Sequence, residues 1–409
     1  MARSSLFPAS VQPGKPILPL CPPGWTTVKF RDVLEIVERP VDLIDDVEYQ
    51  LVTAKRSRGG VVARSRLLGR DVLTKTQFLI ARDDFLMSNR QIIHGGCGIV
   101  PPALDGAVVS NEYSVLRPKS NLLLEFLGYL SHSIYFQQTC FHASVGVDVE
   151  KMIFDCEHWL EFRFHLPPLR EQRRIAEILS SVDEAIAATR AVIEQTRKVK
   201  QGMLERLLTK GIGHTRFKQT ETGEIPEGWR LCRVEDLLDR PPGKVRKLKT
   251  TDYLPSGKIS IVDQGEKLIC GFTNELDATV RSDTPLVAFG DHTRHLKFID
   301  FPFAVGADGV QLLRPKPTLL PKYFYYALCG IPLPSRGYAR HFKDLREWKI
   351  PVPPIDEQQK IILAIEAFDN SLAVNEGDLK ARQLLKAALM SDLLTGRKRM
   401  TDTLPMAAE

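Results

Sequence analysis

The sequence predicts an α+β protein in which two mixed α/β domains are separated by two long helices that form an antiparallel coiled coil. Two repeated motifs support this fold class. The tetrapeptide Pro-Pro-Gly-Trp at 22–25 returns as Pro-Glu-Gly-Trp at 226–229. The decapeptide Leu-Pro-Pro-Leu-Arg-Glu-Gln-Arg-Arg-Ile at 166–175 returns as Val-Pro-Pro-Ile-Asp-Glu-Gln-Gln-Lys-Ile at 352–361. Because both motifs recur in the same order, the chain is an internal repeat for which we expect a pseudo-twofold arrangement.

Each long helix is predicted by apolar residues that recur with heptad spacing after the Pro-Pro motif. The seam residues are Ile175, Leu179, Val182, Ile186 and Ile193 in the first helix, and Ile361, Ile365, Phe368, Leu372 and Leu379 in the second. The prolines suit the first turn, and Gly211 and Gly396 suit the ends. Ordinary packing of an amphipathic helix would produce one such seam, but two copies in matching register favour a coiled coil.

The direction of pairing follows from the length of the helices. A helix of about 38 residues is ~55 Å long, whereas the globular part between the helices, about 145 residues, should have a radius of gyration of ~15 Å. Parallel pairing would require this domain to bridge most of a helix length, so we expect antiparallel pairing. Four polar residues lie on the seam: Lys200, Asn375, Arg382 and Lys386. We expect that the helix ends splay there or that another protein covers them.

The repeats divide the chain into segments. These are a proline-rich N-terminal extension (1–21), a first globular domain (22–166), a first long helix (167–210), a linker (211–225), a second globular domain (226–352), a second long helix (353–396) and a C-terminal tail (397–409). Short apolar runs bounded by glycine, proline and aspartate predict strands in both domains. Helices are expected at 122–137 and 323–328. The extension and the tail have no counterpart in the repeat.

The composition is that of a globular protein, since 43% of the residues are hydrophobic and 26% are charged. No apolar run approaches the ~18 residues of a membrane span, and the opening segment lacks the apolar core of a secretory signal. We therefore expect a cytoplasmic protein with no membrane partner. The 56 Lys and Arg residues exceed the 50 Asp and Glu residues, a balance that permits a nucleic-acid partner without requiring one.

Basic residues cluster in the first domain without an intervening acid. They are Lys55, Arg56, Arg58, Arg64 and Arg66. Such a run can contact DNA phosphates, although a solvated basic face without a ligand gives the same pattern. In the second domain a comparable stretch stands at the comparable place after the tryptophan: Lys244, Arg246, Lys247 and Lys249. A basic segment in both copies favours the nucleic-acid interpretation.

Candidates for reading base edges lie in later loops. Asparagine, glutamine and arginine side chains can make paired hydrogen bonds to adenine or guanine. The candidates are Asn89, Arg90 and Gln91 in the first domain, and His292 and Arg294 in the second. The spacing of His292 and His295 also suits a metal, but a zinc site needs four ligands and no cysteine pair lies nearby, so we expect no metal.

No motif for catalysis is complete. The chain has no full P-loop, and each Pro-Pro pair lacks the flanking residues of an amino-methyltransferase motif. The triplet Glu-Trp-Lys at 347–349 has the acid-x-lysine form found in nucleases, but such triplets occur by chance in most chains. We therefore predict that the protein is not an enzyme.

In their order and their repetition, these motifs resemble the specificity subunit of type I restriction-modification systems over essentially the whole chain. The resemblance implies two target-recognition domains, each reading part of a bipartite site in double-stranded DNA. It also implies that the seam residues of the helices support a platform for two copies of a modification subunit, with a spacer role for the helices. The partner would bring S-adenosylmethionine and methylate adenine, and a restriction subunit would join through the complex. This chain would bind no cofactor itself.

Two alternatives remain open from the sequence. One is an orphaned or type II-like specificity subunit, which would bind DNA similarly but have different partners. The other is a coiled-coil adaptor that does not bind DNA, for which the basic stretches would be dispensable and no salt-sensitive DNA binding would occur.

Overall fold

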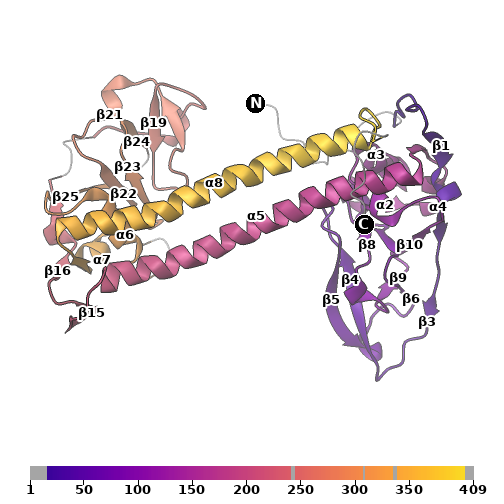
Figure 1. Cartoon of the computed structure of the whole chain (residues 1–409), viewed down its shortest axis with the longest axis horizontal. Coiled ribbons are helices and arrows are strands. Elements are labelled where there is room, and N and C mark those ends of the chain that lie inside the picture. Colours follow the sequence, from indigo (N-terminus) through magenta and orange to yellow (C-terminus); the bar gives the residue numbers. More distant parts are fainter. Residues whose placement is uncertain (1–15, 241–244, 307–308, 335–338, 401–409) are drawn as a thin grey trace, which may run out of the picture. The chain divides into compact units, whose positions relative to one another are not determined.

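The computed structural model describes residues 16–240, 245–306, 309–334 and 339–400, and it divides into two compact units. Residues up to Ala188 and from Leu379 onward form the first unit, and the residues between them form the second. Two long helices, α5 (Leu169–Lys210) and α8 (Ile355–Leu393), each contribute one part to each unit. They are the longest coiled ribbons in Figure 1. Both predicted long helices are therefore confirmed.

The first domain is built on two sheets, one ordered β2-β10-β7-β8 and the other β3-β6-β9-β4-β5. The strands are β2 (Leu34–Ile36), β3 (Pro40–Val41), β4 (Glu48–Ala54), β5 (Val61–Leu68), β6 (Gln77–Leu79), β7 (Phe85–Ser88), β8 (Cys97–Ile99), β9 (Val108–Ser110) and β10 (Tyr113–Pro118). β4 pairs in parallel with β9 and antiparallel with β5. A separate antiparallel pair, β1 (Thr26–Lys29) with β13 (Arg163–Leu166), joins the start of the domain to its end.

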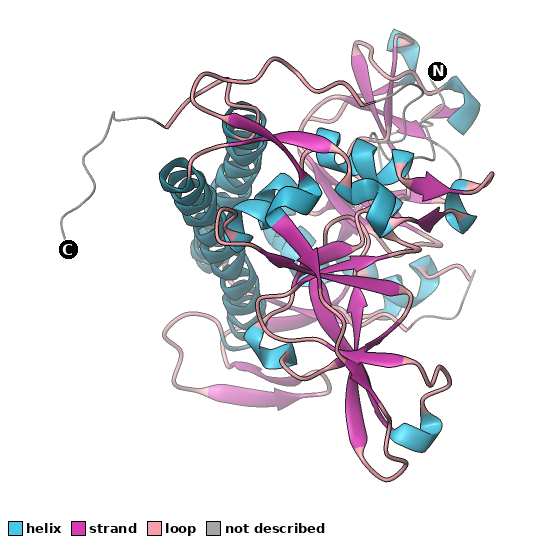
Figure 2. Cartoon of the chain, turned by 90° about the vertical axis from the view of Figure 1, so that its right-hand side faces the viewer, coloured by secondary structure: helices cyan, strands magenta, loops and turns pink. Residues whose placement is uncertain are grey.

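Short helices and one small hairpin complete the first domain, whose side faces the viewer in Figure 2. The helices are α1 (Phe30–Val33), α2 (Leu124–Leu130), α3 (Ile134–His142) and α4 (Cys156–Leu160), and the hairpin consists of β11 (Ser144–Val145) and β12 (Ile153–Phe154). The single helix predicted at 122–137 is thus two helices. The break occurs because the Ser133 hydroxyl accepts a hydrogen bond from the amide of Phe136 at 3.2 Å, which caps a new helix.

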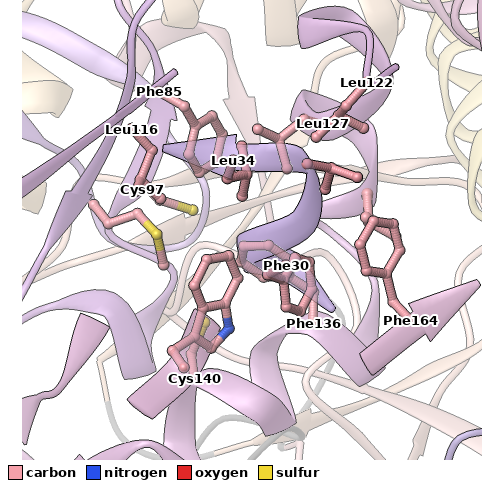
Figure 3. Packing of buried hydrophobic residues seen from close by; sticks show 14 of the residues in the cluster. Phe30, Leu34, Phe85, Cys97, Leu116, Leu122, Leu127, Phe136, Cys140 and Phe164 are labelled. Atoms are coloured by element: carbon pink, nitrogen blue, oxygen red, sulfur yellow. The ribbon is translucent and has the colours of Figure 1, made fainter. Parts of the chain in front are cut away.

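The core of the first domain is centred on Phe30. Its ring lies 4.1 Å from that of Trp159 and 4.5 Å from that of Phe164, both stacked, and 5.7 Å from that of Phe136 in an edge-on contact. Figure 3 shows the labelled side chains of this core around the short α1 segment. Aromatic packing of this kind adds to the burial of apolar area. The same cluster takes in Ile175 and Leu179 of α5 and Leu393 and Leu394 at the end of α8.

The second domain repeats the two-sheet plan. Its sheets are ordered β17-β25-β22-β23 and β18-β24-β19-β20, with β21 also paired to β24. The strands are β17 (Leu238–Asp239), β18 (Lys247–Leu248), β19 (Ile259–Val262), β20 (Gly271–Thr273), β21 (Thr279–Val280), β22 (Leu286–Gly290), β23 (Leu296–Ile299), β24 (Phe303–Gly306) and β25 (Val310–Pro315). The pair β16 (Arg230–Arg233) with β26 (Lys349–Val352) joins the ends, and the helices are α6 (Pro321–Cys329) and α7 (Phe342–Glu347).

The pairings of the two domains correspond. In both, a strand near the domain start pairs with the strand that leads into the Pro-Pro motif, and a central strand pairs in parallel on one side and antiparallel on the other. The internal repeat therefore extends from the motifs to the strand order. A hairpin outside this plan, β14 (Phe217–Thr220) with β15 (Gly223–Pro226), occupies the segment predicted as a linker.

Within each unit the two long helices run antiparallel. In the first unit the beginning of α5 packs with the end of α8, and in the second the end of α5, at Leu204, Leu207 and Leu208, packs with the beginning of α8 at Ile361 and Ile365. Both Figure 1 and Figure 2 show the helices side by side. The predicted antiparallel coiled coil is therefore confirmed.

The seam lysines are paired inside each unit, which corrects the expectation that they splay apart or are covered by another protein. In the first unit Lys386 Nζ lies 2.6 Å from Asp183 Oδ1, and the Tyr129 hydroxyl of α2 donates to Asp183 Oδ2 at 3.1 Å. The equivalent group in the second unit is Lys200, Asp369 and Tyr326. A lysine on the seam is tolerated because a carboxylate of the facing helix neutralises it and a domain tyrosine completes the hydrogen bonding.

Candidate nucleic-acid interface

Three loops meet at one edge of the first domain. They are loop 55–60 between β4 and β5, loop 89–96 between β7 and β8, and the β11–β12 hairpin. The backbone amide of Ser57 donates to the carbonyl of His94 at 2.7 Å, and the amide of Arg58 donates to the carbonyl of Gly95 at 3.1 Å. The amide of Phe154 donates to the carbonyl of Asn89 at 2.8 Å, which ties the hairpin to the same edge.

Glycines permit this close approach. Gly95 has a φ of 80°, and a Cβ there would lie 3.0 Å from Arg58 Cγ and 3.1 Å from the Arg58 backbone nitrogen. A Cβ on Gly98 would lie 3.0 Å from the Cα of Gly60. A side chain at either position would crowd the facing loop, and the positive φ of Gly95 adds backbone strain for any other residue.

The second domain assembles three loops in the same way. They are loop 263–270 between β19 and β20, loop 291–295 between β22 and β23, and the described residues 330–334 and 339–341 before α7. The Thr293 hydroxyl donates to the carbonyl of Gln264, and Arg294 Nη1 donates to the carbonyl of Leu333 at 2.8 Å. His292 Nδ1 donates to the carbonyl of Ala339 at 3.2 Å.

Backbone contacts show which positions of the two edges are equivalent. The amide of Asn89 donates to Glu112 and its carbonyl accepts from Phe154, at 2.8 Å each. The amide of Asp291 donates to Gly309 at 2.7 Å, and its carbonyl accepts from His341 at 2.9 Å. At these positions the two domains therefore share backbone contacts and differ in their side chains.

The predicted basic residues of the first domain divide between two environments. Lys55, Arg56, Arg64 and Arg66 are exposed on loop 55–60 and strand β5. Arg58, in contrast, is half-buried and lines a cavity of about 880 Å³. Burial lowers its pKa, and its Nε has no hydrogen-bond partner. The structure therefore places Arg58 facing inward, away from the surface on which we expected it.

The predicted base-reading residues of the first domain make hydrogen bonds to other residues of the same domain. Asn89 Nδ2 donates to the carbonyl of Asn111 at 3.3 Å, and its Oδ1 accepts from the Ser114 hydroxyl at 2.8 Å. Arg90 Nε donates to Glu112 Oε1 at 2.6 Å, and Gln91 Oε1 accepts from Arg56 Nε at 2.6 Å. These hydrogen bonds hold loop 89–96 in its conformation. To read bases, its residues would have to replace them with hydrogen bonds to base edges.

The basic stretch of the second domain does not correspond to that of the first, which overturns the expectation that both stand at comparable places. Loop 263–270 is the counterpart of loop 55–60, whereas Lys247 belongs to β18, a strand paired with β24. Arg246 Nη1 forms ion pairs with Glu275 at 2.8 Å and Asp277 at 2.9 Å, and Lys249 is exposed. Lys244 lies outside the described residues.

His292 and Arg294 lie in loop 291–295, where their contacts to carbonyl groups join two of the three loops. Arg294 has a φ of 64° and is the backbone counterpart of Gly95. Across the described part of the chain, His, Cys, Asp and Glu side chains form no group of three that would hold a metal ion. His292 contributes to the loop scaffold through its contact with the Ala339 carbonyl.

Sequence reasoning found the repeated tryptophan and glutamate but not the contact between them. Trp25 Nε1 donates to Glu171 Oε2, and Trp229 Nε1 donates to Glu357 Oε2, each at 2.9 Å. The second carboxylate is also 2.7 Å from His214 Nε2. The available signal was that each residue stands at the same position within its own repeated motif in both copies. Each bond fastens the entry of a domain to the first turn of a long helix.

The residues predicted to support the partner platform lie mostly inside the helix pair. Ile175, Leu179, Ile186, Ile193, Ile361 and Ile365 are buried, and Val182, Phe368, Leu372 and Leu379 are partly exposed. Apolar side chains of the two helices that face solvent include Val192, Val199, Leu363, Val374, Leu384 and Leu385. The seam residues can therefore support a platform by holding the two helices together. Direct contacts with a partner protein would be made by the exposed residues.

Each unit contains two antiparallel helix parts and a two-sheet domain with a three-loop edge. This arrangement occurs twice, which defines a class of duplicated recognition protein. The type I restriction modification DNA specificity domain matches residues 22–196 and 226–382. The chain therefore belongs to this family of specificity subunits and carries two of its domains.

Known proteins resemble the chain over nearly its full length. It is 23% identical to the putative type I restriction enzyme MjaX specificity subunit of Methanocaldococcus jannaschii, over 93% of this chain and 95% of that protein. It is 24% identical to the MjaVIII specificity subunit from the same organism, over 93% of this chain and 94% of the relative. A shorter match, 32% identical, covers 34% of this chain and 39% of the EcoR124I/EcoR124II specificity subunit of Escherichia coli.

Solved structures share the fold. The S subunit of a type I restriction-modification system from M. genitalium has a TM-score of 0.58 at 16% identity and covers 93% of this chain and 99% of its own. The HsdS subunit from Thermoanaerobacter tengcongensis has a TM-score of 0.50 at 20% identity, with 92% and 98% covered. In the described ranges, no helix is both long and apolar enough to cross a bilayer.

Proposed function

We propose that this chain is the non-catalytic DNA-recognition subunit of a type I restriction-modification complex. The observation that carries the proposal is the three-loop edge, which shares the backbone contacts of Asn89 and Asp291 between the domains but carries different side chains in each. One scaffold with two sets of side chains suits a bipartite site in double-stranded DNA, with one half read by each domain. Exposed arginines on loop 55–60 and β5 would bind phosphates, and loop side chains would read bases.

The helix pair serves, in this proposal, as the platform for two copies of a modification subunit. The Lys-Asp-Tyr group and the buried seam occur in each unit, so each unit offers an equivalent helix surface. The exposed apolar side chains on α5 and α8 supply contact area that a partner would remove from water. S-adenosylmethionine and the chemistry of adenine methylation belong to the modification subunit, and the restriction subunit joins through the complex in the cytoplasm.

The decisive experiment is co-expression with a candidate modification subunit from the same genome, followed by sequencing that maps methylated adenines. We expect a split motif with a fixed, unspecified spacer that appears only when this chain is present. A control culture expresses the modification subunit alone and should show no such motif.

Other outcomes would identify the alternatives. A stable complex that adds no methylation would contradict the proposal and favour an orphaned role. A chain that forms a complex but shows no salt-dependent DNA binding would be a coiled-coil adaptor. Methylation at an unsplit motif would contradict the assignment of one half-site to each domain.

A further inference from the structure

The β11–β12 hairpin of the first domain exposes apolar side chains where a surface strand usually carries polar ones. Val145 and Ile153 are directly opposite each other across the hairpin and are 70% and 51% exposed. Val147, in the turn between the strands, is fully exposed. The other face of the hairpin is packed, since Met152 and Phe154 are buried in the domain core. The exposed face is thus a small apolar patch on a firmly anchored ribbon.

This patch lies beside the basic surface of the same domain. Glu150, in the hairpin turn, accepts a hydrogen bond from Arg56 Nη2 of loop 55–60 at 2.9 Å. Arg56 also donates to Gln91 of loop 89–96. The ion pair partly neutralises Glu150, and Lys151 next to it is exposed. A DNA duplex bound by the exposed arginines of loop 55–60 and β5 would therefore lie next to the hairpin.

The shape and chemistry of the patch select one feature of DNA. A two-stranded β-ribbon fits the major groove, and aliphatic side chains there contact the 5-methyl group of thymine. Valine and isoleucine side chains offer no hydrogen bond, so they cannot read the polar edges of other bases. A carboxylate such as that of Asp148, in the same turn, is compatible with a base edge because it can accept a hydrogen bond from cytosine N4.

We propose that the β11–β12 hairpin enters the major groove and that Val145, Val147 and Ile153 read thymine methyl groups in one half-site. This inference rests on the proposed function, because it assigns a base preference to one of the two domains. A protein partner is the other possible occupant. DNA is favoured because the hairpin is bonded to both neighbouring loops of the three-loop edge.

The second domain places its exposed apolar residues on a different loop. The segment equivalent to the β11–β12 hairpin, before α7, carries the exposed Arg340 among its described residues. Leu268 and Ile269, at 44% and 39% exposure, lie instead on loop 263–270. Among the described residues, the exposed apolar side chains of the two edges therefore lie on different loops, as expected of two domains that read different half-sites.

The test measures binding of the assembled complex of this chain with its modification subunit to duplexes that contain the mapped site. Each thymine in both half-sites is replaced in turn by deoxyuridine, which lacks only the 5-methyl group. At one or two positions of a single half-site we expect binding about fourfold weaker per methyl, the change that follows from the loss of one buried methyl-sized group. The variant Val147→Ser should remove that dependence, so the two changes are not additive.

Leu73→Ser is the matched control. Leu73 is 97% exposed in the same domain but lies beyond the end of β5 that is remote from loop 55–60. This variant should keep the full dependence on the thymine methyl group. A dependence that Leu73→Ser abolishes as well would contradict the assignment to the hairpin.

The outcomes separate the inference from the function on which it rests. A mapped target in which neither half-site responds to methyl removal overturns the inference while the DNA-recognition function stands. Unchanged methyl dependence in Val147→Ser does the same. If Val147→Ser instead prevents assembly with the modification subunit, the patch is a protein-docking surface and the inference is wrong. A complex that binds no bipartite site at all contradicts the proposed function itself.

Discussion

At the scale of single residues, the environment of Glu171 explains why the Pro-Pro motif carries an acid. Its side chain is almost fully buried, and burial alone would raise its pKa. Hydrogen bonds from Arg399, from the amide of Met400 and from Trp25 outweigh burial, so the pKa of Glu171 is lowered. The charged form is therefore stabilised by folding. One carboxylate thus joins the domain entry, the first turn of α5 and the chain beyond α8.

The neighbouring glutamine of the motif has an equally specific environment. The Gln172 side chain accepts from the amide of Leu123 at 2.8 Å and donates to the carbonyls of Asn121 and Pro167, at 2.9 Å each. Gln358 makes the same three kinds of bond in the second unit. The repeat revealed that these residues matter, but their partners were not predictable because they come from distant loops.

We predict that Glu171→Gln lowers the free energy of unfolding by about 1.5–3 kcal/mol at pH 7, the range for hydrogen bonds to a charged group. Because folding lowers the pKa of Glu171, its contribution is fully present above the unfolded pKa of about 4.3 and is lost as the pH falls through the folded value. The difference between variant and wild type should therefore shrink in acid. Urea unfolding between pH 7 and pH 3 measures this, with exposed Glu177→Gln as the control. A difference independent of pH would contradict the role of the charge.

At the scale of elements, strand β5 and loop 55–60 form the basic part of the recognition edge. Arg64 and Arg66 are both exposed on β5, at the point where its pairing with β4 shifts register. The sequence predicted the long helices well because a heptad pattern depends only on local spacing. The sequence did not predict which loops contact each other, because contacts between loops at the ends of strands depend on the order of the strands in the sheets. The prediction located the basic stretches by their order after each tryptophan. It therefore matched the segment that contains β18 to loop 55–60, whereas the structural counterpart of loop 55–60 is loop 263–270.

Charge removal at Arg56, Arg64 and Arg66 should weaken DNA binding by the complex and reduce its salt dependence. Each lost phosphate contact lowers the slope of log K against log salt by about 0.9. Titrations of labelled duplex at several salt concentrations measure that slope. Arg58→Gln should leave the slope unchanged, because Arg58 faces the cavity.

Arg70→Gln is the control for this prediction. Arg70 is exposed and pairs with Asp46 at 2.7 Å beyond the far end of β5. An unchanged slope in the triple variant would remove β5 and loop 55–60 from the DNA interface. A reduced slope in Arg58→Gln would show that this side chain leaves the cavity when DNA binds.

At the scale of the whole molecule, the duplication was predictable and the composition of each unit was not. The repeated motifs predicted two domains and two helices in order. Each unit, however, combines the beginning of one long helix with the end of the other, so the first unit includes residues from Leu379 onward. From sequence order alone, each domain would be expected to form a unit with only the helix that follows it. The observed first unit differs because antiparallel pairing brings the end of α8 to the first domain.

Replacement of Ile186 and Leu372 by Asp should abolish assembly with the modification subunit. Ile186 is buried, and an unpaired carboxylate on the seam would separate the helices. Co-purification with a tagged modification subunit measures assembly, and circular dichroism reports whether the domains remain folded. Retained assembly would contradict the platform model.

Variants of the exposed helix face separate indirect from direct effects. Leu363→Asp and Val374→Asp change side chains that are 58% and 72% exposed and leave the seam intact. Loss of assembly in these variants, with the fold retained, would locate the partner on that face. If only the seam variants lose assembly with the modification subunit, the helix pair supports assembly through its rigidity and not through this exposed face.

The bonds from Arg399 and Met400 to Glu171 also determine the order in which the chain can mature during synthesis. All residues of the second unit have been made once Asp378 is added, but the first unit still lacks the end of α8 and the two residues that bond to Glu171. The domain that is translated first is therefore the last to be completed. Until the end of α8 has been made, Ile175 and Leu179 lack Leu393 and Leu394, which belong to the same core cluster. A chain truncated before the end of α8 would therefore have an incomplete first unit, although the second unit would be complete.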